Sequence, residues 1–213
     1  MTLKLDRLEV GLRILLIACS CMILHSCSII SSTDRQPKVL QLKSAENHEA
    51  KVAALADWTA RARISVQTSE DSFSADLIWT QIGAAYNLRL SGPFGSGALT
   101  IRGNNSQVIL LTSDGQSFLA GTPEELMLAQ LGWSVPLSQL RYWLVGIPDR
   151  SSLENLTVEL TDKVGRYASF SQFDCEVIYK DYYDDRDPNV PRKLLIGCED
   201  LKSRIVIKKW EIR

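Results

Sequence analysis

Apolar and polar residues alternate with a period of two along most of the chain after residue 60. For example, Tyr86, Leu88 and Leu90 are separated by Asn87 and Arg89. Such alternation is typical of strands that have one buried face and one face in water. The predicted strands lie at 62–66, 73–79, 86–90, 99–101, 107–112, 116–120, 157–161, 166–171, 174–180, 193–198 and 204–212. Short strands joined by tight turns predict an antiparallel meander of about 10–11 strands.

Two helical segments interrupt the strands. The first begins at Thr122, and Glu125 three residues later completes the pattern of a capping box. The second carries large apolar residues on one side, namely Leu137, Leu140, Trp143 and Leu144. Gly146 ends it, because glycine readily adopts the left-handed conformation that stops a helix. A further helix is predicted at 46–58, ahead of the first strand.

A sheet with this many strands is expected to curl, because twist accumulates from one strand to the next. The two helices inserted midway can lie across the apolar face of the curled sheet. We therefore predict a mainly β fold, an incompletely closed antiparallel β-barrel with an α-helical lid.

Large apolar residues are expected to line the interior under that lid. They are Phe73, Leu77, Trp79, Tyr86, Leu88, Ile101, Trp143 and Tyr179. On the residues alone, this lining forms either a solid core or an apolar cavity, and most aromatic stripes are core packing.

The first 26 residues have the pattern of a secretory signal peptide. Lys4, Arg7 and Arg13 precede an apolar run from residue 14 to residue 24, too short for a bilayer span of about 20 residues. The residues before Cys27 resemble the lipobox of bacterial lipoproteins, which implies cleavage before Cys27 and acylation of this cysteine. Cys19 is a rival site, but a cut there would leave only about five apolar residues, short of the 7–15 expected.

These patterns divide the chain into a signal peptide at 1–26, an acylated tether at 27–45 and one domain at 46–213. The tether is predicted because this segment has many polar residues and little periodicity. The net charge of −1 and the absence of a basic sequence block give no indication of a nucleic-acid partner.

Cys175 and Cys198 are the two cysteines expected in the mature body, in a compartment that permits disulfides. If the strands at 174–180 and 193–198 form a hairpin that pairs Lys180 with Lys193, the two cysteines lie opposite each other. A disulfide and two buried free thiols both remain open on this reasoning.

The mature chain offers little material for catalysis. Its one histidine, His48, lies on the predicted front helix, where we expect it to be exposed, so a Ser-His-Asp arrangement lacks a base. No cluster of ligands predicts a metal site. The loop at 181–187 holds four aspartates but lacks the ordered spacing of a calcium loop, so a solvated loop is favoured. We predict neither an enzyme nor a bound cofactor.

The segment 91–97 places one large aromatic residue, Phe94, among three glycines and Pro93 at a strand–strand connection. Turn chemistry explains the glycines and the proline. It leaves Phe94 with two interpretations: an exposed apolar residue that makes a contact, or a residue that tucks under the sheet edge.

Several of these segments together resemble the outer-membrane lipoprotein receptor family LolB. The matching parts are Cys27-Ser28 and the segments LIWTQ (77–81), YNLRL (86–90), GPFGS (92–96) and VPLSQLRYWLVG (135–146). Their order and spacing agree over most of residues 46–213. The chain departs from the family pattern at Cys175, where tryptophan is usual, and at Phe94, where leucine is usual.

The resemblance implies an unclosed barrel with a helical lid and a cavity for the acyl chains of lipoproteins. It implies that the cargo comes from a periplasmic LolA-like carrier and is released into the outer membrane, with Phe94 touching the bilayer. The protein would then be a lipid-anchored monomer of the outer membrane that faces the periplasm. Binding of another lipid and a purely structural envelope role are the alternatives that stay open.

Overall fold

The structure, a computed structural model, describes residues 38–92, 97–131, 136–152 and 155–213. In this part of the chain eleven strands form one antiparallel sheet. The strands are β1 (Asp57–Thr68), β2 (Ser72–Ile82), β3 (Ala85–Ser91), β4 (Leu99–Gly103), β5 (Val108–Leu111), β6 (Ser117–Ala120), β7 (Thr157–Thr161), β8 (Tyr167–Gln172), β9 (Cys175–Tyr183), β10 (Val190–Cys198) and β11 (Leu201–Ile212).

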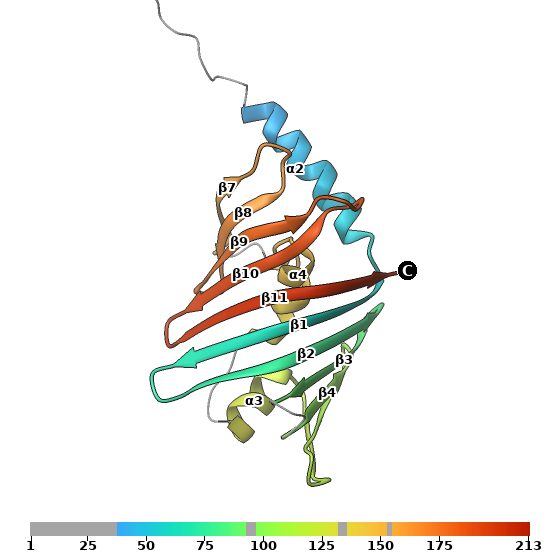
Figure 1. Cartoon of the computed structure of the whole chain (residues 1–213), viewed down its shortest axis with the longest axis vertical. Coiled ribbons are helices and arrows are strands. Elements are labelled where there is room, and N and C mark those ends of the chain that lie inside the picture. The colour runs from blue at the N-terminus through green and yellow to red at the C-terminus, as the bar shows by residue number, and fades with distance from the viewer. Residues whose placement is uncertain (1–37, 93–96, 132–135, 153–154) are drawn as a thin grey trace, which may run out of the picture. The chain divides into compact units, whose positions relative to one another are not determined.

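The strand order across the sheet is β6-β5-β4-β3-β2-β1-β11-β10-β9-β8-β7. Neighbours in the sheet are neighbours along the chain except at the centre, where β1 lies beside β11 (Figure 1). These two strands pair from Trp58 opposite Ile212 to Thr68 opposite Leu201. The edge strands β6 and β7 do not pair with each other in the described part of the chain. The sheet is therefore open, which confirms the prediction of an incompletely closed barrel.

One face of the sheet is buried, as the alternation of residues predicts. In β1, Ala62 and Val66 are buried while Arg61 and Gln67 are exposed. The register between β1 and β11 shifts after Arg61, and such a bulge bends a strand and increases its twist. The buried side of the sheet and the helices that cover it form a continuous hydrophobic core.

Three helices lie within the described residues: α2 (Lys38–Ala53), α3 (Pro123–Leu131) and α4 (Leu137–Val145). Helices α3 and α4 confirm the two predicted between the strands, but α2 differs from the helix predicted at 46–58. It begins at Lys38, so residues 38–45 are helical and the prediction that they belong to an irregular tether was wrong.

Helix α2 also ends earlier than predicted, at Ala53, and Trp58 belongs to β1. Trp58 is 4% exposed, and its ring packs against Trp79 of β2 and Trp210 of β11. Burying an aromatic ring of this size stabilises the strand more than one further helical turn would stabilise the helix. The end of α2 is therefore set by the sheet.

Helices α3 and α4 form the lid, and α4 lies against the buried face of the sheet (Figure 1). The predicted cap of α3 is present, because the Glu125 backbone N–H donates to Oγ1 of Thr122 at 3.2 Å. Gly146 ends α4 in the left-handed conformation with φ of 101°, as predicted. The two helices are joined by the carboxylate of Glu124, which accepts hydrogen bonds from the backbone N–H and the hydroxyl of Ser138 at 2.8 and 3.1 Å.

Candidate functional site

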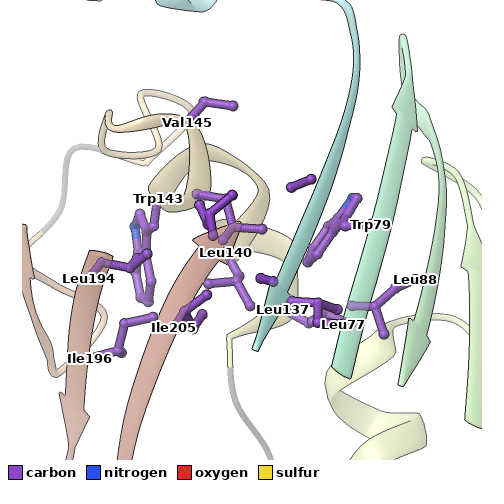
Figure 2. Packing of buried hydrophobic residues seen from close by; sticks show 14 of the residues in the cluster. Leu77, Trp79, Leu88, Leu137, Leu140, Trp143, Val145, Leu194, Ile196 and Ile205 are labelled. Atoms are coloured by element: carbon purple, nitrogen blue, oxygen red, sulfur yellow. The ribbon is translucent and has the colours of Figure 1, made fainter. Parts of the chain in front are cut away.

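An apolar pocket lies between the lid and the buried face of the sheet. Side chains of α4 point from the lid towards strands of both halves of the sheet (Figure 2). The lining residues are Ile64, Val66, Phe73, Leu77, Leu88, Leu90, Leu99, Ile101, Met127, Pro136, Leu137, Leu140, Trp143, Ile196, Leu201, Ser203 and Ile205. Ser203 is the one polar residue among them. This composition suits a hydrocarbon ligand and gives almost no means of orienting a polar one.

The pocket is nearly closed. The space that it leaves for water-sized molecules is about 50 Å³, far below the roughly 300 Å³ at the lower end of ordinary ligand pockets. In this conformation the side chains of the lid occupy the interior. A large apolar ligand would therefore need the lid to shift.

Five of the eight residues predicted to line the interior do line this pocket: Phe73, Leu77, Leu88, Ile101 and Trp143. Four of them come from β2, β3 and β4, and Trp143 comes from α4. The structure thus places these five residues, which are up to 70 positions apart in the sequence, around one apolar space.

The other three predicted residues, Trp79, Tyr86 and Tyr179, are not among the lining residues. The Trp79 ring packs on Trp58 and on Tyr86, with centroids 6.1 and 5.8 Å apart. Tyr179 donates its hydroxyl to the backbone carbonyl of Trp143 at 2.8 Å, and burial raises the pKa of that hydroxyl well above its usual value. Burial likewise raises the pKa of Tyr86 to about 12. These residues pack beside the pocket.

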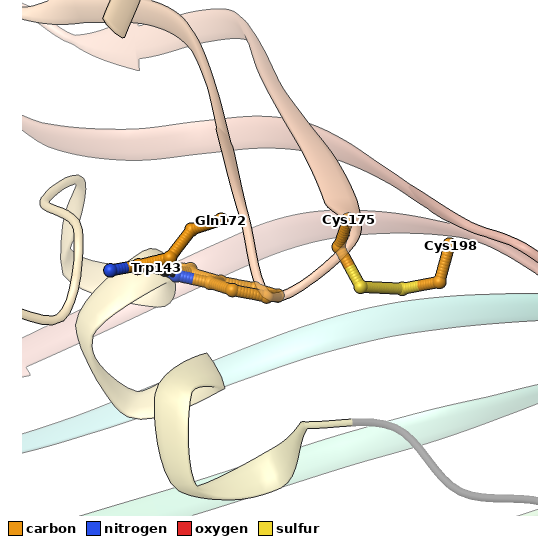
Figure 3. The surroundings of a disulfide bond; sticks show 4 residues. All are labelled: Trp143, Gln172, Cys175 and Cys198. Carbon is orange, nitrogen blue, oxygen red and sulfur yellow. Dashed lines mark hydrogen bonds between the residues drawn. A yellow bond between two sulfur atoms is a disulfide. The ribbon is translucent and has the colours of Figure 1, made fainter. Parts of the chain in front are cut away.

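A buried glutamine, Gln172, fastens the lid to the sheet, and the sequence analysis did not identify it. Its Oε1 accepts hydrogen bonds from Nε1 of Trp143 at 3.2 Å and from the backbone N–H of Asp149 at 2.9 Å. Its Nε2 donates to the carbonyls of Asp149 and Ser152 at 2.8 and 3.0 Å. All four hydrogen-bonding positions of the amide are therefore used, and the C-terminal end of α4 is held to β8 (Figure 3).

Cys175 and Cys198 form a disulfide between β9 and β10, with an S–S distance of 2.05 Å and Cα atoms 4.2 Å apart (Figure 3). The hairpin register differs from the predicted one at one point, because Lys193 lies opposite Asp181 and not Lys180. The irregularity ends there, and Leu194 to Gly197 lie opposite Tyr179 to Glu176. This register carries the two cysteines to the same end of the hairpin.

Replacing both cysteines by alanine should lower the free energy of unfolding by about 3 kcal/mol, because the bond joins residues 23 positions apart and restricts the unfolded chain. Urea denaturation of the double variant checks this, and the wild-type protein under reducing conditions is the matched control. Denatured, unreduced wild-type protein should show no free thiol in residues 38–213. Equal stability of the variant and the wild type would show that the bond contributes nothing.

Helix α2 is attached to β8 and to the loop after α4 by a charged cluster. Arg150 donates from Nε and Nη2 to the carboxylate of Glu49 at 2.5 and 2.6 Å, and the hydroxyl of Tyr167 donates to Glu49 at 2.6 Å. Burial alone would raise the pKa of the Glu49 carboxyl, but the hydrogen bonds from Arg150 and Tyr167 outweigh it and lower the pKa. His48 is half-buried and not exposed as expected, and burial lowers its pKa.

The four aspartates at 181–187, at the end of β9 and in the loop after it, face cations of the protein. Asp181, Asp184, Asp185 and Asp187 form ion pairs with Arg192, Arg166, Arg186 and Lys51, respectively. Within the described residues no group of three or more potential metal ligands is found. In the same part of the chain, no helix is long and apolar enough to cross a membrane.

Cys27, Pro93 and Phe94, the predicted attachment site and loop residues, lie outside the described residues. The strands that flank residues 93–96 are described. Because β3 runs antiparallel to β2 and ends at Ser91, opposite Asp76, this connection leaves the sheet at the same end as the β1–β2 and β10–β11 turns.

Comparisons with known proteins agree over most of the chain. The family model described as "Outer membrane lipoprotein LolB" matches residues 56–210. The outer-membrane lipoprotein LolB of Pseudomonas aeruginosa (strain LESB58) is 30% identical over 202 residues, which are 95% of this chain and 97% of that protein. The protein of the same name from Pseudomonas syringae pv. syringae is 32% identical over 166 residues, 78% of this chain and 80% of that one.

A solved structure shows a similar fold without sequence similarity. A DUF1329 family protein from Desulfovibrio piger aligns with a TM-score of 0.52 and 6% identity, and the alignment covers 83% of this chain and 93% of that one.

Proposed function

The chain belongs to the outer membrane lipoprotein LolB family, and from this premise we propose that its apolar interior receives the acyl chains of lipoproteins. Family membership makes it a non-enzymatic outer-membrane lipoprotein receptor of the lipoprotein localisation system. Its partners are a periplasmic LolA-like carrier and acylated lipoproteins. We further propose that it acts as a monomer, anchored through acylated Cys27 and facing the periplasm.

The observation that carries the proposal is the pocket under α4, whose lining is apolar apart from Ser203. Each methylene that leaves an apolar cavity for water costs about 0.8 kcal/mol, and a lipoprotein carries long acyl chains. Transfer from one apolar cavity to another avoids this cost. A gradient of affinity from carrier to receptor to bilayer is then sufficient to drive transfer without a nucleotide.

The pocket must open to accept the chains, and the hydrogen bonds of the lid indicate where. The C-terminal end of α4 is tied to β8 and β9 through Gln172 and Tyr179. Helix α3 packs on β5, β6 and α4, and within the described residues it makes no hydrogen bond to the sheet. We propose that α3 and the N-terminal half of α4 move together, coupled by Glu124 and Ser138, while the end at Trp143 stays in place.

A transfer experiment tests the proposed function. A soluble form carrying Cys27→Ala should remove radiolabelled lipoprotein from the carrier and form an isolable complex with it. The same lipoprotein without its acyl chains should not transfer, because it has no apolar group to place in the pocket. An apolar, environment-sensitive dye should bind one to one and be displaced only by the acylated form.

Failure of the soluble form to take acylated lipoprotein, with its fold intact by circular dichroism, would refute the receptor mechanism. Release of the dye by a different membrane lipid alone would instead favour the binding of that lipid. In the full chain, Cys27→Ala should abolish labelling with palmitate, whereas Cys19→Ala should leave it unchanged.

A further inference from the structure

A groove lies at one end of the central strands, and some of its lining residues also line the apolar pocket. It has a volume of about 680 Å³ and lies where the β1–β2 and β10–β11 hairpins turn. Its lining residues are Ser65, Val66, Gln67, Ser72, Phe73, Ser74, Glu176, Ile178, Leu195, Ile196, Gly197, Lys202, Ser203 and Arg204. Val66, Phe73, Ile196 and Ser203 line both the groove and the pocket. We call these four shared residues the junction of the groove and the pocket.

Ser203 stands at this junction with an unsatisfied hydroxyl. In the sheet it lies between Val66 of β1 and Ile196 of β10, in one row across three strands. Its side chain is 7% exposed, and its Oγ has no hydrogen-bond partner within the described residues. A buried polar group without a partner destabilises the folded state by about 1–3 kcal/mol. A residue of this kind, the one polar group in an apolar lining, is suited to a ligand that brings an acceptor.

The two residues that flank Ser203 are basic and lie on the outer side of β11. Lys202 and Arg204 are exposed, and neither forms an ion pair or hydrogen bond within the described residues. They lie opposite Gln67 and Ser65 of β1, whose polar side chains continue the groove. Glu176 is the acidic residue of the lining. The groove therefore carries basic and other polar side chains, whereas the lining of the pocket is apolar apart from Ser203.

We propose that this junction holds the polar end of the acylated cargo. The Ser203 hydroxyl donates a hydrogen bond to an ester carbonyl oxygen of the diacylglyceryl group, the acyl chains lie in the pocket, and the peptide that follows the acylated cysteine lies in the groove. An ester carbonyl is an acceptor only, which matches the free hydroxyl. Lys202 and Arg204 then favour peptides with acidic residues close to the lipid. This inference rests on the proposed receptor function.

The test compares the binding of two synthetic lipopeptides to the otherwise full-length Cys27→Ala form. This form is not acylated, so no acyl chain of its own competes for the pocket. One lipopeptide has ester-linked palmitoyl chains, and the other has ether-linked hexadecyl chains of the same length. Both are titrated against a bound apolar dye. Ser203→Ala should weaken binding of the ester lipopeptide about 5- to 10-fold, the effect of one hydrogen bond, and change binding of the ether lipopeptide less than about 2-fold. Ser171→Ala, a serine of β8 outside both linings, is the matched control.

A second comparison varies the peptide. The wild-type groove should bind an ester lipopeptide with two aspartates after the acylated cysteine more tightly than one with two lysines. The Lys202→Glu, Arg204→Glu variant should reverse this order, and salt should weaken both preferences.

The outcomes distinguish failure of the proposed receptor function from failure of the inference about Ser203. If neither lipopeptide displaces the dye from the wild type, the proposed function fails and this inference fails with it. If both bind but Ser203→Ala affects ester and ether forms equally, Ser203 does not contact the carbonyl and the inference alone is wrong. Thermal unfolding of each variant confirms that its fold is kept. If the charge-reversed variant still prefers the aspartate lipopeptide over the lysine lipopeptide, the peptide does not lie in the groove.

Discussion

Phe94→Glu is expected to leave lipoprotein uptake intact and to block delivery into membranes, so that cargo accumulates on the receptor. Phe94 belongs to the glycine- and proline-rich segment that connects β3 and β4. A carboxylate entering the apolar layer of a bilayer costs several kcal/mol, whereas at a loop tip in water it costs almost nothing. Since about 1.4 kcal/mol corresponds to a factor of ten, delivery should fall at least about 100-fold. The readout is radiolabelled lipoprotein retained on the receptor and absent from liposomes.

Phe94→Leu is the matched control and should be nearly silent, because apolar bulk at this position is all that the role requires. Normal delivery by Phe94→Glu would show that the loop does not enter the bilayer. Unfolding of that variant would show that Phe94 packs against the body. Either result would refute insertion of the loop into the bilayer, but the proposed binding of acyl chains in the pocket would be unaffected.

Trp143→Ala is expected to lower the free energy of unfolding by about 3–5 kcal/mol, as is usual for removal of a fully buried tryptophan. The side chain is 1% exposed and its ring packs edge-on against Phe170, with centroids 6.3 Å apart. The substitution also removes the indole donor to Gln172, a fully buried amide. For a domain of this size the midpoint of thermal unfolding should fall by roughly 6–20 °C. Differential scanning calorimetry measures it directly.

Leu128→Ala provides the comparison for this prediction, since Leu128 lies in the other lid helix and is 59% exposed. It should change stability by less than about 0.5 kcal/mol. A loss for Trp143→Ala no larger than that for Leu128→Ala would mean that α4 is not packed as described. A large loss of stability with unchanged dye affinity would separate the structural role of Trp143 from its place in the pocket lining.

The sheet and the lid followed from residue patterns because each strand and helix carries its own periodicity. Leu137, Leu140, Trp143 and Leu144 recur at helical spacing, and all four are buried against the sheet. The C-terminal boundary of helix α2 could not be predicted from the sequence, since Trp58 is equally compatible with the end of an amphipathic helix and the start of a strand. Pairing with β11 decides between them, and β11 lies some 150 residues further along the chain.

Only part of the pocket lining could be predicted from the sequence. Phe73, Leu77, Leu88 and Ile101 carry no polar atoms in their side chains and line it, while Trp79 and Tyr179 have polar groups that found partners elsewhere. That difference of chemistry is only a partial signal, because Trp143 has a polar indole N–H and still lines the pocket. Gln172 also left a signal: it directly follows the strand predicted at 166–171, and its position two residues after the apolar Phe170 places it on the same, buried face. The groups that it bonds belong to Trp143 of α4 and to Asp149 and Ser152 of the loop that follows, and no local pattern brings these to β8.

The pairing of β1 with β11 fixes the order in which the molecule can be completed. A polypeptide that emerges N-terminus first presents β1 with an unpaired edge until all later strands have appeared. The segment from β1 to β6 and the segment from β7 to β10 can each assemble from local hairpins, but neither buries the tryptophans at the seam between them. Such long-range closure slows folding and exposes strand edges that invite aggregation. The contact between β1 and β11 is therefore the last pairing in the sheet that the order of synthesis permits.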